Sequence, residues 1–174
     1  MLFRSNIIVL PNNKNIILTA EQAGELAKDK KVHVIKTLSI PQGIACVVTN
    51  SDTISLEDNL SGMKDAMEAV HCGQITQAVR DTVLDGKTIK ENDFLCLYDG
   101  EIALVEKDLQ SAAYALIDHM LSFGGDIVSV YHGENTTPEM AEELSAYICQ
   151  KHPMAEVEVY DGKQPLYSYI ISVE

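Results

Sequence analysis

The stretch that decides the fold is residues 7–48, which read IIVLPNNKNIILTAEQAGELAKDKKVHVIKTLSIPQGIACVV. It contains two short apolar runs, Ile7–Leu10 and Val32–Ile35, whose length and β-branched content are typical of buried strands. A segment with helical periodicity follows each run. Strands that alternate with helices predict a parallel sheet with covering helices, so we expect this stretch to form a βαβα unit.

Both expected helices carry start signals. Thr19-Ala-Glu-Gln22 has the spacing of a capping box, and the apolar face behind it runs to Ala27. Ser39-Ile-Pro-Gln42 is a second match, with its proline in the first turn, where the missing N–H costs no hydrogen bond. The helix after it, Gly43–Val48, is apolar almost all round, so we expect it to be buried. A longer amphipathic helix has its apolar positions at Leu56, Leu60, Met63, Met67 and Val70.

The hydrophobic period changes at Gly73, where we place a boundary between subdomains 1–72 and 73–174. The turn signals Asp85-Gly86 and Asp99-Gly100 separate β-prone runs, which predicts an antiparallel meander. The runs are residues 74–83, 94–98 and 101–105. Helices are expected over 109–121 and from 137 to before 153, with strands at 127–131, 157–160 and 169–173, the last two joined across Asp161-Gly162.

The fold class that these patterns predict is α/β with two packed subdomains. The first is the N-terminal βαβα parallel-sheet unit, and the second is a C-terminal mixed-sheet α/β lobe.

Composition restricts the classes of partner and cofactor. The chain has 174 residues, a hydrophobic content of 46% and a formal net charge of −13, which repels nucleic acid phosphates and anionic lipids. No apolar run approaches the ~18 residues of a membrane span, so we expect no membrane insertion. The four cysteines form no C-x-x-C pair, as is typical of reduced thiols in a cytoplasmic protein. No phosphate-binding loop or Asp-rich cluster is present, so we expect no ATP, metal or catalytic site.

Two loops are candidates for binding an anion. Asn12, Asn13, Lys14 and Asn15 follow the first expected strand, and loops at the carboxyl ends of strands form the ligand crevice of open α/β sheets. An ammonium and three amides there suit a carboxylate or a phosphate, although a solvated turn explains them equally. Gln42 lies at a helix N-terminus whose N–H groups can bind an anion, with simple helix capping as the alternative.

Three further residues are candidates for contacting a partner. Arg80 lies with Asp81 in a β-type run, where neighbouring side chains point to opposite faces. Gln164 and Tyr167 belong to a polar, aromatic segment beside a strong strand, a composition that suits a protein interface. Ordinary surface charge and a tyrosine-lined junction between the lobes are the corresponding alternatives.

Two histidines have neighbours that suggest chemistry. His71-Cys72 is expected at a helix end, where the macrodipole favours a histidine, and it lacks the second pair that a zinc site requires. His132-Gly-Glu134 follows a strand and contains the elements of an acid/base pair, but an exposed turn is the simpler interpretation.

Taken together and in order, several segments resemble one family. They are residues 7–15, 39–43, 73–82, 85–86, 161–167 and 170–174. This set looks like the C-terminal domain of bacterial fatty acid kinase A, in the YloV-type, dihydroxyacetone kinase-related family.

The resemblance implies a DegV-like fold and a place in lipid metabolism. Family members join a DhaL-like ATP-binding domain, a middle domain and this C-terminal region, so ATP and Mg²⁺ are expected on the kinase domain, in cis or in trans. The region is expected to dock a DegV-type fatty-acid-binding protein that presents an acyl carboxylate for phosphorylation in phospholipid synthesis. No family catalytic residue maps onto this chain, because its motifs begin only after Met1 and lack the kinase signature. Homodimerisation stays open.

Two alternatives remain at this stage. A DegV-like fold can hold a fatty acid between its lobes, with residues 12–15 as the carboxylate clamp. A related substrate-binding kinase component holds a small ketone through a histidine, which would give His71 or His132 that role in a dihydroxyacetone-kinase-like chain.

Overall fold

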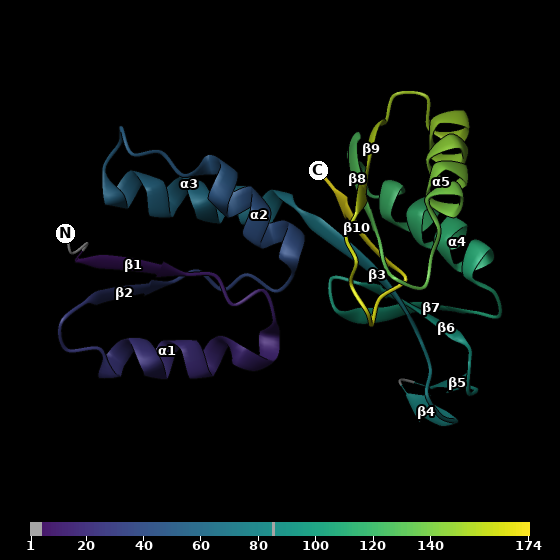
Figure 1. Ribbon diagram of the computed structural model, residues 1–174, viewed down its shortest axis with the longest axis horizontal. Helices are drawn as coiled ribbons and strands as arrows, with labels where there is room; N and C mark the ends of the chain where they lie inside the picture. The colour runs from purple at the N-terminus through teal and green to yellow at the C-terminus, as the bar shows by residue number, and fades with distance from the viewer. Residues whose placement is uncertain (1–4, 85) are drawn as a thin grey trace. The chain divides into compact units, whose positions relative to one another are not determined.

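The computed structural model describes residues 5–84 and 86–174 (Figure 1). The chain divides into two compact units, one ending at Val70 and the other beginning at His71. Each unit has a hydrophobic core of its own. No helix among the described residues is long and apolar enough to cross a lipid bilayer.

Unit 1 contains the expected parallel strand pair. Strand β1 (Asn6–Val9) pairs in parallel with β2 (Lys31–Val34), and Ile8 lies opposite His33. A 3₁₀ turn, η1 (Lys14–Ile16), leads into helix α1 (Ile17–Leu26), which lies on one side of the strands in Figure 1. Helices α2 (Ile40–Thr49) and α3 (Leu56–Ala69) lie on the other side and enclose a small core of Ile35, Cys46 and Met63.

The two helix-start predictions in unit 1 have different outcomes. Ser39 caps α2 as expected, because its hydroxyl accepts the backbone N–H of Gln42. Thr19 lies inside α1, so the capping box predicted there is wrong. The helical stretch starts earlier because the Asn13 side chain caps η1 by accepting the N–H of Asn15 at 2.8 Å.

The predicted burial of α2 is also wrong. Only one face of the helix packs, through Pro41, Gly43 and Cys46, whereas Val47 and Val48 are 61% and 78% exposed. The physical reason is that the two-stranded sheet and α3 supply a packing surface for a single face, however apolar the rest of the helix is.

Unit 2 is a six-stranded mixed sheet covered on one face by two helices (Figure 1). The strand order is β7-β6-β3-β10-β8-β9, and every neighbouring pair is antiparallel except β8 and β9. The strands are β3 (His71–Gln77), β6 (Phe94–Tyr98), β7 (Glu101–Glu106), β8 (Ile127–His132), β9 (Glu156–Asp161) and β10 (Tyr169–Val173). The helices are α4 (Leu109–Leu121) and α5 (Pro138–Lys151).

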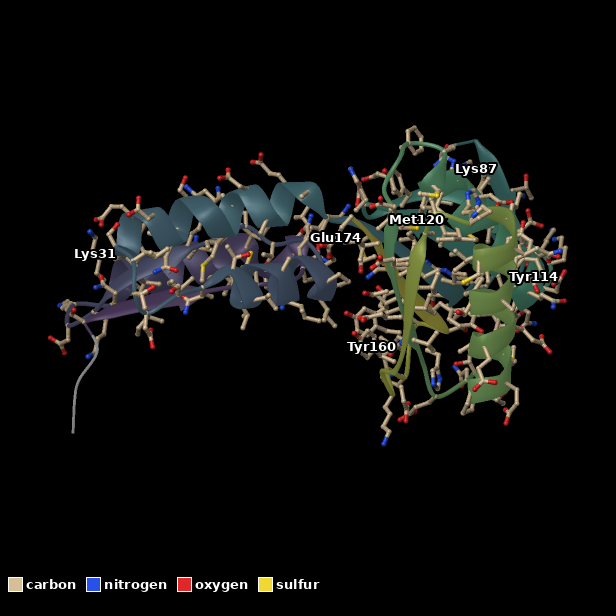
Figure 2. All side chains as sticks on the ribbon, turned by 90° about the horizontal axis from the view of Figure 1, so that it is seen from above. Lys31, Lys87, Tyr114, Met120, Tyr160 and Glu174 are labelled. Carbon is tan, nitrogen blue, oxygen red and sulfur yellow. The ribbon has the colours of Figure 1, made fainter. Side chains whose placement is uncertain are left out.

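The core of unit 2 lies between these helices and the sheet. Leu116 and Ile117 of α4 and Leu144 of α5 are at most 1% exposed, and they meet the buried side chains of β8 and β10. Met120, labelled in Figure 2, closes the same layer near the end of α4. Burying apolar surface in one continuous layer is the main stabilising contribution to such a unit.

The meander prediction is correct for β3, β6 and β7, but the first strand is shorter than expected. It ends at Gln77, and a separate antiparallel ribbon follows, made of β4 (Thr82–Leu84) and β5 (Lys87–Ile89). Gly86, in the turn between them, has the positive φ of +76° that a tight hairpin turn requires, and Asp85 lies outside the described residues. The second turn, Asp99-Gly100, also has positive φ at both residues.

Three other details differ from the sequence-based expectation. β9 and β10 are not neighbours, because β8 lies between them in the sheet. His71 starts β3 instead of ending a helix. His132 is only 6% exposed, so the expected exposed turn at this position is wrong; it belongs to β8 and is covered by the loop that follows it.

Candidate functional site

The loops that follow β1 and β2 are fastened to each other by their own side chains. The backbone N–H of Asn12 donates to the hydroxyl of Thr37 at 3.0 Å, and that hydroxyl donates to the side-chain oxygen of Asn12 at 2.8 Å. Thr37 is fully buried, and Asn12 adopts a left-handed backbone with φ +58°. The pair therefore satisfies polar groups that would otherwise be buried without partners.

The Asn12 side chain also occupies the space beside the first turns of α2. A Cβ atom at Gly43 would overlap the side-chain amide of Asn12, so this close approach depends on the glycine. Gln42 contributes from the same turn: its side-chain oxygen accepts the N–H of Leu38 at 2.8 Å, and its side-chain nitrogen donates to the carbonyl of Val70 at 3.3 Å. The amides at this helix start therefore hold the unit together.

The four residues 12–15 do not converge as one clamp. The side chain of Asn12 turns toward Thr37, whereas that of Asn13 caps η1. Lys14 and Asn15 are exposed on η1. That these residues bind a carboxylate stays a prediction, but two of the three amides already have partners within the chain.

Arg80 lies on a rigid projection of unit 2. It is exposed in a bend between β3 and β4, not within a strand as expected. The ribbon β4–β5 is fixed to the sheet edge because the ammonium of Lys87 donates to the carbonyls of Ile102 and Ala103 in β7, at 2.6 and 2.7 Å. Ile89 of β5, only 1% exposed, anchors the ribbon from the inside.

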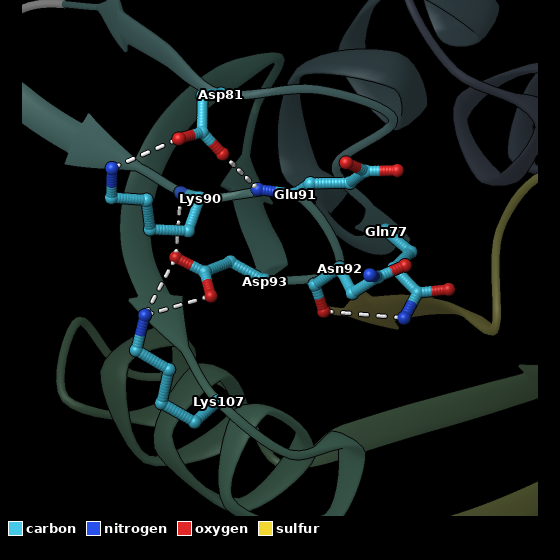
Figure 3. Close-up of polar contacts among 7 residues, drawn as sticks. All are labelled: Gln77, Asp81, Lys90, Glu91, Asn92, Asp93 and Lys107. Atoms are coloured by element: carbon cyan, nitrogen blue, oxygen red, sulfur yellow. Dashed lines mark hydrogen bonds and ion pairs between the residues drawn. The ribbon is translucent and has the colours of Figure 1, made fainter.

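A network of carboxylates and lysines fixes the base of this ribbon (Figure 3). Asp93, only 4% exposed, accepts two hydrogen bonds from the Lys107 ammonium and one from the N–H of Lys90. Asp81 accepts from the Lys90 ammonium at 2.9 Å and from the N–H of Glu91 at 2.8 Å. The Lys107 ammonium and then the Lys90 amide hold the pKa of the Asp93 carboxyl below its usual value.

The outer surface of the projection is apolar around Arg80. Val79 and Val83 are 86% and 68% exposed, and Leu84 is also exposed. Of the lysines nearby, Lys90 and Lys107 are paired with carboxylates. Among residues 5–84 and 86–174, no side chain forms an ion pair or a hydrogen bond with the Arg80 guanidinium. We call Val79, Arg80, Val83 and Leu84 the ribbon surface; the sequence singled out only Arg80.

Gln164 and Tyr167 belong to the loop before β10, and the structure gives Gln164 an internal role. Its side-chain nitrogen donates to the carbonyl of Tyr131 at 2.8 Å, and its backbone carbonyl accepts the N–H of Glu134. The hydroxyl of Thr76 donates to the carbonyl of Leu166, which ties the same loop to β3. Tyr167 is half-buried, and the nearby Leu166 side chain is 73% exposed.

The histidines have partners that explain their positions. The His71 ring is 2.8 Å from a carboxylate oxygen of Asp99 and stacks on Tyr98. The buried His132 ring lies 3.4 Å from the hydroxyl of Thr136. Within the part of the chain that the structure describes, no three His, Cys, Asp or Glu side chains are placed to hold a metal ion.

Comparison with known proteins identifies the family. The model for the FakA-like C-terminal domain of fatty acid kinase matches residues 3–174. Protein YloV of Bacillus subtilis is 40% identical over 168 residues, which cover 97% of this chain and 30% of that protein. An uncharacterised protein of Staphylococcus haemolyticus is 39% identical over 167 residues, or 96% of this chain and 30% of that protein. The chain thus spans less than a third of the length of these relatives.

Solved structures show the same fold at low sequence identity. A DegV family protein of Corynebacterium glutamicum has a TM-score of 0.68 at 17% identity, over 97% of this chain and 75% of that one. The fatty acid kinase B3 protein of Streptococcus pneumoniae, loaded with linoleic acid, has a TM-score of 0.67 at 14% identity, over 98% and 72%. The dihydroxyacetone kinase of C. freundii, in complex with AMP-PNP and Mg²⁺, has a TM-score of 0.62 at 10% identity, over 97% and 38%. The DegV-like fold predicted from the sequence is therefore confirmed.

The contact between Asn12 and α2 can be tested through its glycine. We expect Gly43→Ala to lower the free energy of unfolding by about 1–3 kcal/mol, because the new methyl group displaces the Asn12 amide. Gly62→Ala is the matched control within α3, where a Cβ meets only one methyl group, of Thr49, at 3.3 Å. Its effect should be neutral or slightly stabilising, as alanine favours a helix by up to about 1 kcal/mol over glycine. Urea unfolding of both variants measures the difference, and equal values would contradict the contact.

The ribbon network predicts a pH dependence of stability. The folded-state pKa of Asp93 lies below the unfolded value of about 3.9, so its contribution is present above that pH and is lost as the pH falls through the folded pKa. Asp93→Asn should therefore be less stable than the parent protein at pH 7, and the gap should shrink toward pH 3. Urea midpoints across this range measure it. The exposed control Asp52→Asn should keep a constant, small difference, and a gap for Asp93→Asn that does not change with pH would refute the role of the network.

Proposed function

The chain belongs to the family of FakA-like C-terminal domains of fatty acid kinase, and from this membership we propose that it is a non-catalytic module that docks a DegV-type fatty-acid-binding protein. A separate DhaL-like ATP-binding domain, in cis or in trans, then phosphorylates the acyl carboxylate that the docked protein presents. ATP and Mg²⁺ belong to that domain. The chain's own contribution is to bring the acyl carrier within reach of the kinase domain.

The ribbon surface carries this proposal. Apolar side chains around an arginine are the composition that is enriched at protein interfaces, where a few aromatic, apolar or arginine anchors contribute most of the binding free energy. The ribbon is held by Lys87 on β7 and by the ion pairs at its base, so its surface is ordered before a partner arrives. Little conformational entropy is then lost on docking.

Charge favours Arg80 as the contact with an acidic group. The chain has 26 Asp and Glu against 13 Lys and Arg, so most of its surface repels an acidic partner. Around the ribbon, Lys90 and Lys107 are neutralised by their carboxylates, whereas no described residue engages the Arg80 guanidinium. We therefore place Arg80 opposite an acidic residue of the partner, in the middle of apolar contacts.

The alternative of direct fatty acid binding has weaker support. It assigns a carboxylate clamp to residues 12–15, but the Asn12 and Asn13 side chains already serve Thr37 and η1. Linoleic acid is bound by the Streptococcus pneumoniae protein, and at 14% identity that likeness concerns the fold alone. The dihydroxyacetone-kinase-like alternative requires a reactive histidine, whereas the His71 ring is engaged by Asp99.

The test is a calorimetric titration of the chain with an acyl-loaded DegV-type protein. We expect saturable binding, and Arg80→Ala should weaken it at least about tenfold, the loss typical of a buried interface anchor. Lys163→Ala is the control: it removes another cation of unit 2, which is 77% exposed and only loosely paired with Asp161 at 3.7 Å. This control should change the affinity less than about twofold.

Free fatty acid, titrated in parallel, separates the alternatives. The docking proposal expects no heat from free fatty acid. Saturable binding of the free acid that is lost in Lys14→Ala would instead support the clamp alternative. Absence of binding to the acyl-loaded protein would overturn the docking proposal.

A further inference from the structure

A small cavity opens between the N-terminal halves of α4 and α5, within unit 2. Its volume is about 190 Å³. Four apolar side chains form most of its wall: Leu109, Ala113, Met140 and Leu144. The volume is well below the roughly 300–1,000 Å³ of pockets for drug-sized ligands, so the cavity accommodates one side-chain-sized group.

The floor of this cavity carries a polar group for which the described residues supply no partner. Tyr169 of β10 is only 2% exposed and lines the cavity. Among the residues that the structure describes, none forms a hydrogen bond with its hydroxyl, and none of their fully buried polar side-chain atoms lacks a partner. The hydroxyl must therefore reach the open space of the cavity. Burial, and next the charge of Glu143, raise the pKa of Tyr169 to about 12, so the hydroxyl stays protonated at neutral pH.

The mouth of the cavity is acidic and aromatic. Glu143 of α5 lines it, and Glu139 and Glu142 are exposed on the same part of the helix. The Tyr114 ring also lines the mouth, where it lies beside α5 (Figure 2) and stacks on Tyr147 with ring centroids 3.8 Å apart. Gln110 donates to the Tyr114 hydroxyl at 3.1 Å and holds this ring in place.

These features select the charge of a ligand. The carboxylates around the mouth repel an anion, so neither a fatty acid carboxylate nor a phosphate suits the site. A cation gains from Glu143 and from the faces of the tyrosine rings. The tyrosine hydroxyl on the floor has lone pairs that accept an N–H, and the apolar walls suit methylene groups.

We propose that this cavity is a binding site for an alkylammonium group. The ammonium lies between the Glu143 carboxylate and the Tyr169 hydroxyl, and a short unbranched chain of methylenes packs on Leu109 and Leu144. Two sources carry this chemistry, a free alkylamine and the side chain of a lysine from another protein. The inference is independent of the docking proposal, since none of its residues belongs to the ribbon surface.

The test uses three probes of equal length with the intact chain: n-pentylammonium, pentanoate and pentanol, followed by NMR of the methyl groups. We expect saturable shifts at Ala113 and Leu144 with n-pentylammonium and none with pentanoate. Glu143→Gln should weaken the binding about tenfold, the effect of a lost charge-assisted hydrogen bond. Tyr169→Phe keeps the buried ring and should weaken the binding several-fold.

Glu142→Gln is the matched control, because it makes the same change of charge one residue away, outside the cavity lining. It should alter the affinity less than about twofold, as expected for an exposed charge. Equal loss in Glu142→Gln and Glu143→Gln would reduce the effect to general surface charge and overturn the site. Binding of pentanoate as tight as that of n-pentylammonium, or no saturation with any probe, would overturn it too.

A second pair of probes identifies the source. Nα-acetyl-lysine methylamide represents a lysine side chain in a protein, and n-pentylammonium represents a free amine. Tighter binding of the lysine derivative indicates a protein partner, whereas tighter binding of the simple amine indicates a metabolite. Failure of both probes to compete with each other would contradict a shared site.

Discussion

Burial of β10 in the middle of the sheet is the interaction on which unit 2 depends. All five residues Tyr169–Val173 are buried, and the strand pairs with β3 on one side and with β8 on the other. Without it the sheet would separate into two parts, because β3 and β8 have no direct pairing. This strand fixes the direction of β3, and through it the start of the ribbon. It also places the Tyr169 hydroxyl at the floor of the cavity between α4 and α5.

The two units use their polar residues differently. In unit 1 the amides at the strand ends are directed inward: Asn12 reaches Thr37, and Gln42 reaches the carbonyl of Val70. In unit 2 the polar groups of the ribbon base neutralise each other and leave Arg80 outside. A fold that resembles fatty-acid-binding DegV proteins thus carries, at its strand ends, side chains that serve its own structure. A role as a docking module is consistent with this division.

Much of the fold could be predicted from local patterns, and the failures have physical causes. The bounds of α4 are predictable to the residue because a full apolar stripe lies between an Asp108 cap and its end. The exposed face of α2 could not be predicted, because its apolar residues carry no signal of how many elements are available to cover them. Of the candidate site, Arg80 is recognisable by its charge, but the β-type pattern of residues 74–83 places Val79 and Val83 in a strand. The cavity at Tyr169 combines residues from three distant elements, and a single sequence contains no signal for that meeting.

Hydrogen–deuterium exchange of the chain, alone and with an acyl-loaded DegV-type protein, tests the docking role most directly. The amides of residues 79–84 should exchange more slowly in the complex, while free fatty acid should leave residues 12–16 unchanged, since docking covers the ribbon and no clamp closes. Protection of residues 12–16 by free fatty acid alone, with residues 79–84 unaffected by the protein, would contradict docking and establish a ligand-binding domain instead.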